Sequence, residues 1–165
     1  KKTCCWAKAV VSRSRSSVWA RAIHHCMRSL GSAEKALELM VKRAGNREAF
    51  GKTILKLGKN LEVISRARIE IDAMRLMVLQ AAKAMDVMGN KEARVYVSAI
   101  KAMVPEKVCV IIDQAMQMHG ATGISHWSPL PDMYHHQRHL RFADGPDEVH
   151  HMVVGRAEAQ KHGAW

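Results

Sequence analysis

Apolar residues recur every three or four positions along almost the whole chain, which is the spacing of an amphipathic α-helix. The first run predicts a helix from Trp19 to Ala44, ended by Gly45 and Asn46. Its apolar stripe consists of Ile23, Met27, Leu30, Ala33, Leu37, Met40 or Val41, and Ala44. No strand-like alternation, repeat or linker interrupts the sequence. We therefore predict an all-α fold in one domain, an antiparallel four-helix bundle with short loops.

A second apolar stripe predicts a helix that ends at Gly89 and is more than ~45 Å long, at ~1.5 Å rise per residue. Its members are Leu57, Leu61, Ile64, Ile71, Met74, Val78, Ala81 and Met85. Ile69, Leu76 and Leu79 lie off this stripe, so a second face of the helix is also apolar. Such a helix is either central in the fold or shared with another subunit.

The third predicted helix runs from about Val95 to Gly120 and contains Pro105, which should kink or divide it. The following segment, GATGISHWSPLP, is dense in turn-forming residues and predicts a loop. A short helix is expected at about 132–140, and a last helix from Pro146 to about His162. These connections are short, which favours antiparallel neighbours.

The net charge of the chain indicates which partners it can bind and says little about its fold. There are 26 Lys and Arg residues against 15 Asp and Glu, a formal charge of +11. This favours anionic partners such as nucleic acid, phosphorylated cofactors or a membrane surface. Aromatic residues make up only 5% and are too scattered to stack on bases, so we predict no nucleic-acid binding. No apolar run approaches the ~20 residues that a transmembrane helix needs.

The four cysteines show neither metal-ligand spacing nor a disulfide framework, which indicates reduced thiols in an intracellular compartment. His135 and His139 would share a helical face, but no third ligand stands at a defined spacing, so we predict no metal site. The eleven methionines at helical spacing are expected to fill the core rather than form a mobile acyl-binding surface.

Three carboxylates crowd around a Gly-Pro pair in the segment RFADGPDEVHH. Pro146 suits the first helical position, and Asp147 and Glu148 then occupy the first turn, where the helix dipole favours negative charge. Asp144 lies before Gly145-Pro146, outside the helix. Two roles stay open for Asp144: an N-cap or solvent-exposed carboxylate, or a general base tuned by the helix N–H groups and an apolar cleft.

The segment MYHHQRHLRFADGPDEVHHMVV resembles the C-terminal part of the acyl-CoA dehydrogenases, in particular the subgroup of family members ten and eleven with its L-R-x-A-D-G-P-D-E-V-H run. REAFGK (Arg47 to Lys52) is similar to the family's R-x-x-F-G motif, and QMHGATG (Gln117 to Gly123) to its Q-x-x-G-G-x-G loop. IHHCMRSLGSAEKALELM fits the same subgroup. The resemblance extends from about Ile23 to His162 in order.

The resemblance implies a flavin-dependent oxidoreductase of fatty-acid β-oxidation, which uses FAD to dehydrogenate an acyl-CoA thioester to the trans-2-enoyl-CoA. In the family, a carboxylate takes the α-proton while the β-hydrogen leaves as hydride to the flavin. Asp144 matches that base. The backbone N–H that follows the base, here that of Gly145, helps polarise the thioester carbonyl, so Gly145 is expected to bind substrate.

The resemblance also assigns cofactor contacts. Arg47 and Phe50 match residues that reach the FAD of a neighbouring subunit, and Gln117 and Gly120 match the loop near the FAD diphosphate and adenosine. From the residues alone, Arg47 could equally be a cation near a helix C-terminus, and Gly120 a helix-ending glycine.

The family further implies a homo-oligomer, dimer or tetramer, and a mitochondrial location with the peroxisome as the alternative. For the full-length parent, electron-transferring flavoprotein is the expected electron acceptor, and oxygen is the oxidase alternative. Ala121 departs from the family, because it replaces the second glycine of the Gly-Gly pair and adds a methyl group where the backbone meets the cofactor. Leu57 and Gly58 replace a His and a Gln that can contact flavin in relatives.

Residues 1–20 are rich in Arg, Lys and Ser and match nothing in the family. They have the composition of an organelle transit peptide, but we favour a disordered segment or fragment end. Residues 21–165 are expected to form the C-terminal helical bundle of the family. Its N-terminal helical domain and β-domain have no counterpart here, so we expect the chain to be inactive alone. The alternative is a non-catalytic helical oligomerisation or interaction bundle.

Overall fold

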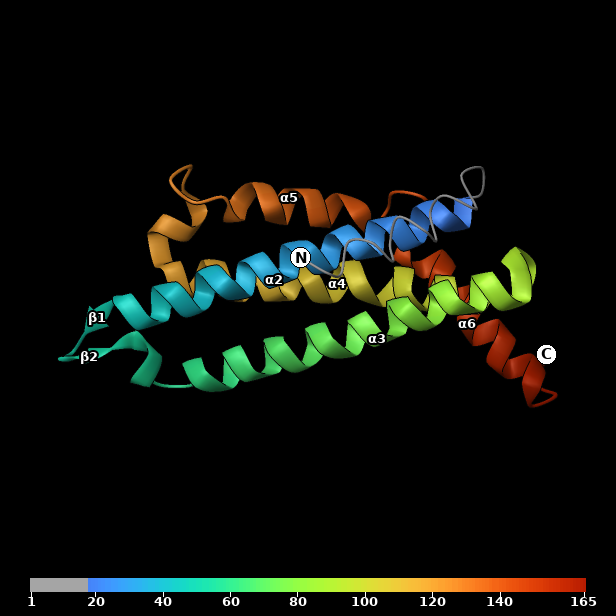
Figure 1. The fold of residues 1–165 in the computed structure, drawn as a ribbon, viewed down its shortest axis with the longest axis horizontal. Coiled ribbons are helices and arrows are strands. Elements are labelled where there is room, and N and C mark those ends of the chain that lie inside the picture. Colours follow the sequence, from blue (N-terminus) through green and yellow to red (C-terminus); the bar gives the residue numbers. More distant parts are fainter. Residues whose placement is uncertain (1–17) are drawn as a thin grey trace.

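The computed structural model describes residues 18–165, which contain five α-helices and one short β-hairpin. The helices are α2 (Val18–Asn46), α3 (Asn60–Glu92), α4 (Arg94–His119), α5 (Leu130–Leu140) and α6 (Asp147–Lys161). Helices α2 to α5 run alternately in opposite directions, and α6 leaves the bundle at an angle (Figure 1). The predicted all-α antiparallel four-helix bundle is confirmed. Most of the predicted leader, residues 1–17, lies outside the described residues.

Helix α2 buries the apolar stripe that its sequence predicts. Ile23, Met40 and Ala44 are almost completely buried, and burial of a large aliphatic side chain stabilises a fold by about 1.5–3 kcal/mol. Ion pairs on the surface connect α2 to α3, since Glu34 binds both Arg68 and Arg75. The hydrogen bond from Arg68 is the largest of the effects that lower the pKa of the Glu34 carboxyl.

The central helix is α4, which packs against α2, α3, α5 and α6. Pro105 is buried inside it and does not divide it, so of the two predicted effects, a kink or a division, the division is excluded. Proline removes one backbone donor and costs about 3 kcal/mol in a helix interior. Apolar side chains of α4 are buried on several faces, including Ile100, Val104 and Ile112. This packing offsets the cost, so the helix continues through the proline.

Helix α3 lies along one edge of the bundle, packed on α2 and α4 (Figure 1). It is therefore not the central helix, which was one of the two alternatives for a helix with two apolar faces. Its off-stripe residues Ile69, Leu76 and Leu79 are exposed. The other alternative, a face shared with another subunit, stays a prediction. Gly89, the predicted end, has non-helical backbone angles (φ 81°, ψ 172°), and α3 continues beyond it to Glu92.

A two-stranded hairpin follows α2 and was not predicted from the sequence. Strands β1 (Glu48–Ala49) and β2 (Lys52–Thr53) pair in antiparallel orientation. The two residues between them, Phe50 and Gly51, both have positive φ (52° and 73°), as in the common two-residue hairpin turns. Short 3₁₀ helices follow the hairpin (Ile54–Lys56) and α4 (Gly120–Ile124). Within residues 18–165, no helix is long and apolar enough to cross a membrane.

Candidate active site

Asp144 lies in a tight elbow between α5 and α6. Asp144 and Gly145 both have positive φ, 55° and 107°. Aspartate tolerates this left-handed region better than most residues, because its short polar side chain can bond locally. The Asp147 N–H donates a hydrogen bond of 3.1 Å to the carbonyl of Arg141 and closes the elbow. The chain thus reverses within a few residues and places Asp144 outside both helices.

The Asp144 carboxylate contacts two cationic or polar side chains of α2. His25 Nε2 lies 2.9 Å from Asp144 Oδ2, and Arg21 Nε lies 3.9 Å from the same oxygen. The Asp144 side chain remains 24% exposed. A carboxylate that is held on one side and open on the other has the geometry that a general base requires.

A completely buried lysine supports the elbow from inside the bundle. Lys101 of α4 is 0% exposed. Its ammonium donates to the carbonyl of Leu140 at 2.6 Å and to that of Gly145 at 3.5 Å. Burial lowers the pKa of Lys101, while the nearby Asp147 and Asp144 act in the opposite direction. Lys101 therefore connects the core to the backbone on both sides of Asp144.

Gly145 is the residue that both the backbone and the packing require. Its φ of 107° is rarely adopted by other residues. A Cβ atom at this position would lie 3.1 Å from Nε2 of His150, a side chain that is itself buried. Burial, with a further contribution from the Lys101 charge, lowers the pKa of His150. The elbow thus rests on two buried basic side chains, one from α4 and one from α6.

The two other carboxylates of the cluster lie in the first turn of α6, as predicted. Pro146 precedes the helix as its N-cap residue rather than occupying the first helical position. Asp147 is buried, and its Oδ2 accepts a hydrogen bond of 2.6 Å from Arg141 Nε. This hydrogen bond raises the pKa of Arg141. Glu148 is exposed. Asp144 is therefore the member of the cluster that combines firm support with access to a ligand.

The residues matched to cofactor contacts lie at the opposite end of the bundle (Figure 1). Arg47 follows α2, and Phe50 stands at the hairpin tip with 95% of its surface exposed. Gln117 and Gly120, both exposed, lie at the end of α4, where Gly120 has a φ of 63°. His25, which contacts Asp144, is separated from this end by about 30 Å of helix α2. The structure does not bring these four residues together with Asp144.

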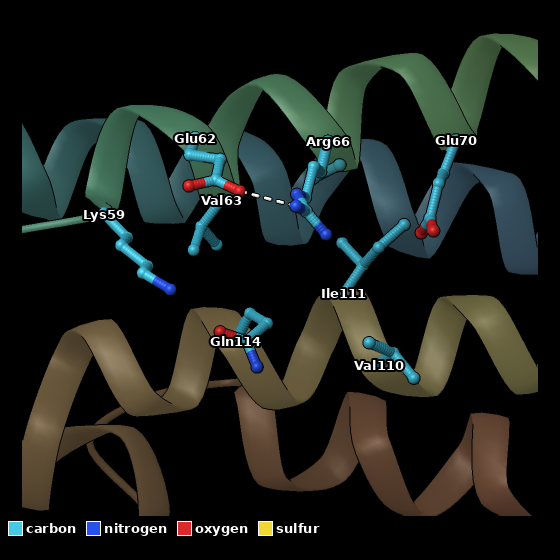
Figure 2. A pocket seen from close by; sticks show the side chains of 9 residues that line it. Lys59, Glu62, Val63, Arg66, Glu70, Val110, Ile111 and Gln114 are labelled. Atoms are coloured by element: carbon cyan, nitrogen blue, oxygen red, sulfur yellow. Dashed lines mark ion pairs between the residues drawn. The ribbon is translucent and has the colours of Figure 1, made fainter.

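A pocket of about 320 Å³ lies between α3 and α4 and contains none of the predicted site residues. Figure 2 shows charges of both signs around it, with Glu62 paired to Arg66 and with Lys59 and Glu70 near the rim. Val63 and Ile111 contribute apolar lining. This mixture of opposite charges does not select one class of ligand.

Three residues of the site were missed in the sequence: His25, Lys101 and His150. His25 and His150 each belong to a His-His pair without a motif of their own. The sequence position of Lys101 indicates that it is buried, because it lies one turn after Val97 and three residues before Val104 on the buried face of α4. A lysine at a core position needs a buried partner. No group of three His, Cys, Asp or Glu side chains able to hold a metal occurs in residues 18–165.

Known proteins resemble this chain over most of its length. The family model for the acyl-CoA dehydrogenase C-terminal domain matches residues 8–159, which includes part of the segment that we set apart as a leader. The chain is 49% identical over 139 residues to the probable acyl-CoA dehydrogenase FadE2 of Mycobacterium tuberculosis, covering 84% of this chain and 34% of that protein. It is 48% identical over 136 residues to acyl-CoA dehydrogenase family member 10 of Mus musculus, covering 82% of this chain and 13% of that protein.

The solved structure of an acyl-CoA dehydrogenase from Slackia heliotrinireducens superimposes with a TM-score of 0.81 at 27% identity, covering 93% of this chain and 40% of that chain. The matched region is therefore the helical C-terminal domain found in proteins named acyl-CoA dehydrogenases, a class of oxidoreductase. The chain belongs to the acyl-CoA dehydrogenase family and contains the family's C-terminal domain. It spans about a third of the length of FadE2 and less of the mouse protein.

Proposed function

We propose that this chain provides the C-terminal domain of an FAD-dependent acyl-CoA dehydrogenase, in which Asp144 removes the α-proton of an acyl-CoA thioester. The observation that carries the proposal is the elbow, where Asp144 is fixed by His25 and stays partly exposed. The reaction would yield the trans-2-enoyl-CoA, as in fatty-acid β-oxidation. When bound, FAD would supply the hydride acceptor for the β-hydrogen.

The proton transfer needs an acidified α-carbon as well as a base. The Gly145 N–H directly follows Asp144 in the elbow and is the donor that we assign to the thioester carbonyl. A backbone donor aimed at a developing enolate oxygen stabilises the charge that forms when the proton leaves. Lys101 accounts for the position of this donor, because it binds the carbonyls of Leu140 and Gly145.

The exposed residues at the other end fit the edges of an FAD molecule in chemical character. Arg47 offers a guanidinium for phosphate oxygens, Phe50 an exposed ring, and Gly120 a backbone that a ligand can approach closely. The length of α2 between the two ends supports the assignment of Arg47 and Phe50 to the cofactor of a neighbouring subunit. An oligomer, a mitochondrial or peroxisomal location and electron-transferring flavoprotein as acceptor of the full-length parent remain parts of this proposal.

A chimera would test the proposal. Residues 23–162 replace the matching region of FadE2, and enoyl-CoA formation is measured with acyl-CoA, FAD and an artificial electron acceptor. We expect the chimera to be active, the isolated chain to be inactive, and Asp144→Asn to reduce the rate by about 10²–10⁴-fold. Glu148→Gln, which changes an exposed carboxylate of the same cluster, should leave the rate within about twofold. An active Asp144→Asn chimera would refute the assignment of the base.

A second candidate function is a non-catalytic oligomerisation bundle, favoured by the exposed apolar face of α3 at Ile69, Leu76 and Leu79. Gel filtration of the isolated chain after addition of FAD separates the two readings. Retained flavin absorbance favours the flavoenzyme domain, and reduced retention in Arg47→Met and Gln117→Ala would locate the contact. A colourless oligomer that dissociates in Leu76→Glu would favour the interaction bundle.

A further inference from the structure

Three side chains form a continuous line that ends at the proposed base. Arg28 Nη2 lies 3.0 Å from His25 Nδ1. His25 Nε2, the other ring nitrogen, lies 2.9 Å from Asp144 Oδ2. Arg28 and His25 belong to neighbouring turns of α2, while Asp144 comes from the elbow before α6. Both ring nitrogens of His25 therefore have a polar partner within hydrogen-bond distance.

The chemistry of the two partners determines which nitrogen of His25 carries the proton. A guanidinium is a donor only, so Arg28 requires a lone pair on Nδ1. A carboxylate is an acceptor only, so Asp144 requires a hydrogen on Nε2. The neutral imidazole with its proton on Nε2 meets both requirements at once. A doubly protonated ring would direct an N–H of Nδ1 at the Arg28 cation.

Burial and the neighbouring basic groups also favour the neutral ring. Burial lowers the pKa of His25, and Arg28 and His24 lower it further, whereas Asp144 raises it. Arg21 also approaches Asp144, but at 3.9 Å and with a side chain that is 63% exposed. This longer and solvated contact does not fix an orientation.

We propose that His25 is a positioning residue that fixes the Asp144 carboxylate through a neutral Nε2–H donor, and that Arg28 keeps the ring singly protonated. This proposal rests on the proposed function of Asp144. A neutral ring at this position has an electrostatic advantage over a charged one. An imidazolium beside the base would favour the ionised carboxylate and oppose the uptake of a proton. A neutral donor orients the same oxygen without that penalty.

NMR of the isolated chain tests this arrangement without depending on catalysis. The ¹⁵N shifts of His25 identify the tautomer, and three-bond couplings to Asp144 Cγ report whether its χ1 angle occupies one rotamer. We expect a proton on Nε2 alone at neutral pH and a single Asp144 rotamer. His25→Gln keeps a donor at the position of Nε2 and should retain this rotamer. His25→Asn, whose amide is too short to reach, should show averaging among rotamers.

Arg28→Met and Arg21→Met form a matched pair. Arg28→Met should move the titration of His25 to higher pH, because the cation at Nδ1 is lost, while Arg21→Met should change it less. A doubly protonated His25 at neutral pH, an Nδ1–H tautomer, or an unchanged Asp144 rotamer in His25→Asn would overturn the positioning role. Equal titration in both arginine variants would overturn the role of Arg28. None of these results bears on whether Asp144 is the base, which the chimera decides separately.

Discussion

The two ends of the bundle present their candidate residues in different ways. At the elbow end, Asp144 is held by His25, and its backbone is bound by the buried Lys101. At the hairpin end, Arg47 and Phe50 point into solvent. The first end has its geometry fixed by the core of this chain. The second end offers exposed side chains that are accessible to a further molecule.

Replacement of Gly145 is expected to have the largest effect on the elbow end. Gly145→Ala introduces a side chain at φ 107° and a Cβ that would lie 3.1 Å from His150 Nε2. We expect the free energy of unfolding to fall by about 3 kcal/mol, measured by urea denaturation followed by circular dichroism. Gly163→Ala, with φ 70° and open space around it, is the control. Equal losses in both variants would mean that the contact with His150 contributes nothing.

Removal of the buried ammonium should weaken the elbow less. Lys101→Met keeps the length of the side chain but leaves the carbonyls of Leu140 and Gly145 without their donor. The loss of these hydrogen bonds costs about 2 kcal/mol, partly offset because a buried charge disappears. Hydrogen exchange of the Asp147 amide, which closes the elbow, should accelerate. Lys107→Met removes only a surface pair with Glu70 and should cost less than about 1 kcal/mol.

Acid should also act on the elbow end. Burial lowers the pKa values of His25 and His150 below the ordinary value of 6.5. Between the ordinary and the lowered values the unfolded chain binds more protons, so stability falls as pH decreases through this window. We expect a lower Tm at about pH 5.5 than at about pH 7.5, and a smaller difference in His150→Gln. A Tm independent of pH across this range would contradict the burial of neutral histidines.

The hairpin end should show the smallest effect, and one of opposite sign. Phe50 has a φ of 52°, which asparagine adopts more readily than a bulky residue. Phe50→Asn should therefore stabilise the fold by about 0.5–1 kcal/mol relative to Phe50→Ala, which keeps the unfavourable backbone without the ring. Thermal unfolding of the two variants measures the difference. A more stable Phe50→Ala would show that the backbone angles at position 50 do not favour asparagine over alanine.

The helices were predictable because their apolar periodicity is local. The helix predicted at Trp19 to Ala44 is observed at Val18–Asn46, since neither end depends on distant residues. The structure excludes one of two predicted outcomes each for Pro105, which does not divide its helix, and for α3, which is not central, because both outcomes depend on other helices. The cost of the proline is offset by packing from other helices, and an apolar second face does not reveal whether a helix lies inside the bundle or at its edge.

The candidate site likewise contains residues that the sequence could predict and residues that it could not. Asp144 and Gly145 stand in a contiguous motif, so the sequence located the elbow. His25 and Lys101 reach it from α2 and α4, which are distant in the sequence, and only tertiary packing brings them there. The Phe50–Gly51 hairpin was missed because its strands contain only two residues each, too few to show alternation.

The bond from Lys101 to Leu140 also makes the fold cooperative in a particular sense. The ammonium is shielded from solvent when α4 is packed and the elbow is closed, and its hydrogen bond to Leu140 then replaces hydration. If the helices were packed but the elbow open, the Lys101 ammonium would lose its carbonyl acceptors. Such a population is therefore disfavoured. Thermal melting of the bundle and loss of the Asp144 geometry should therefore coincide in one transition.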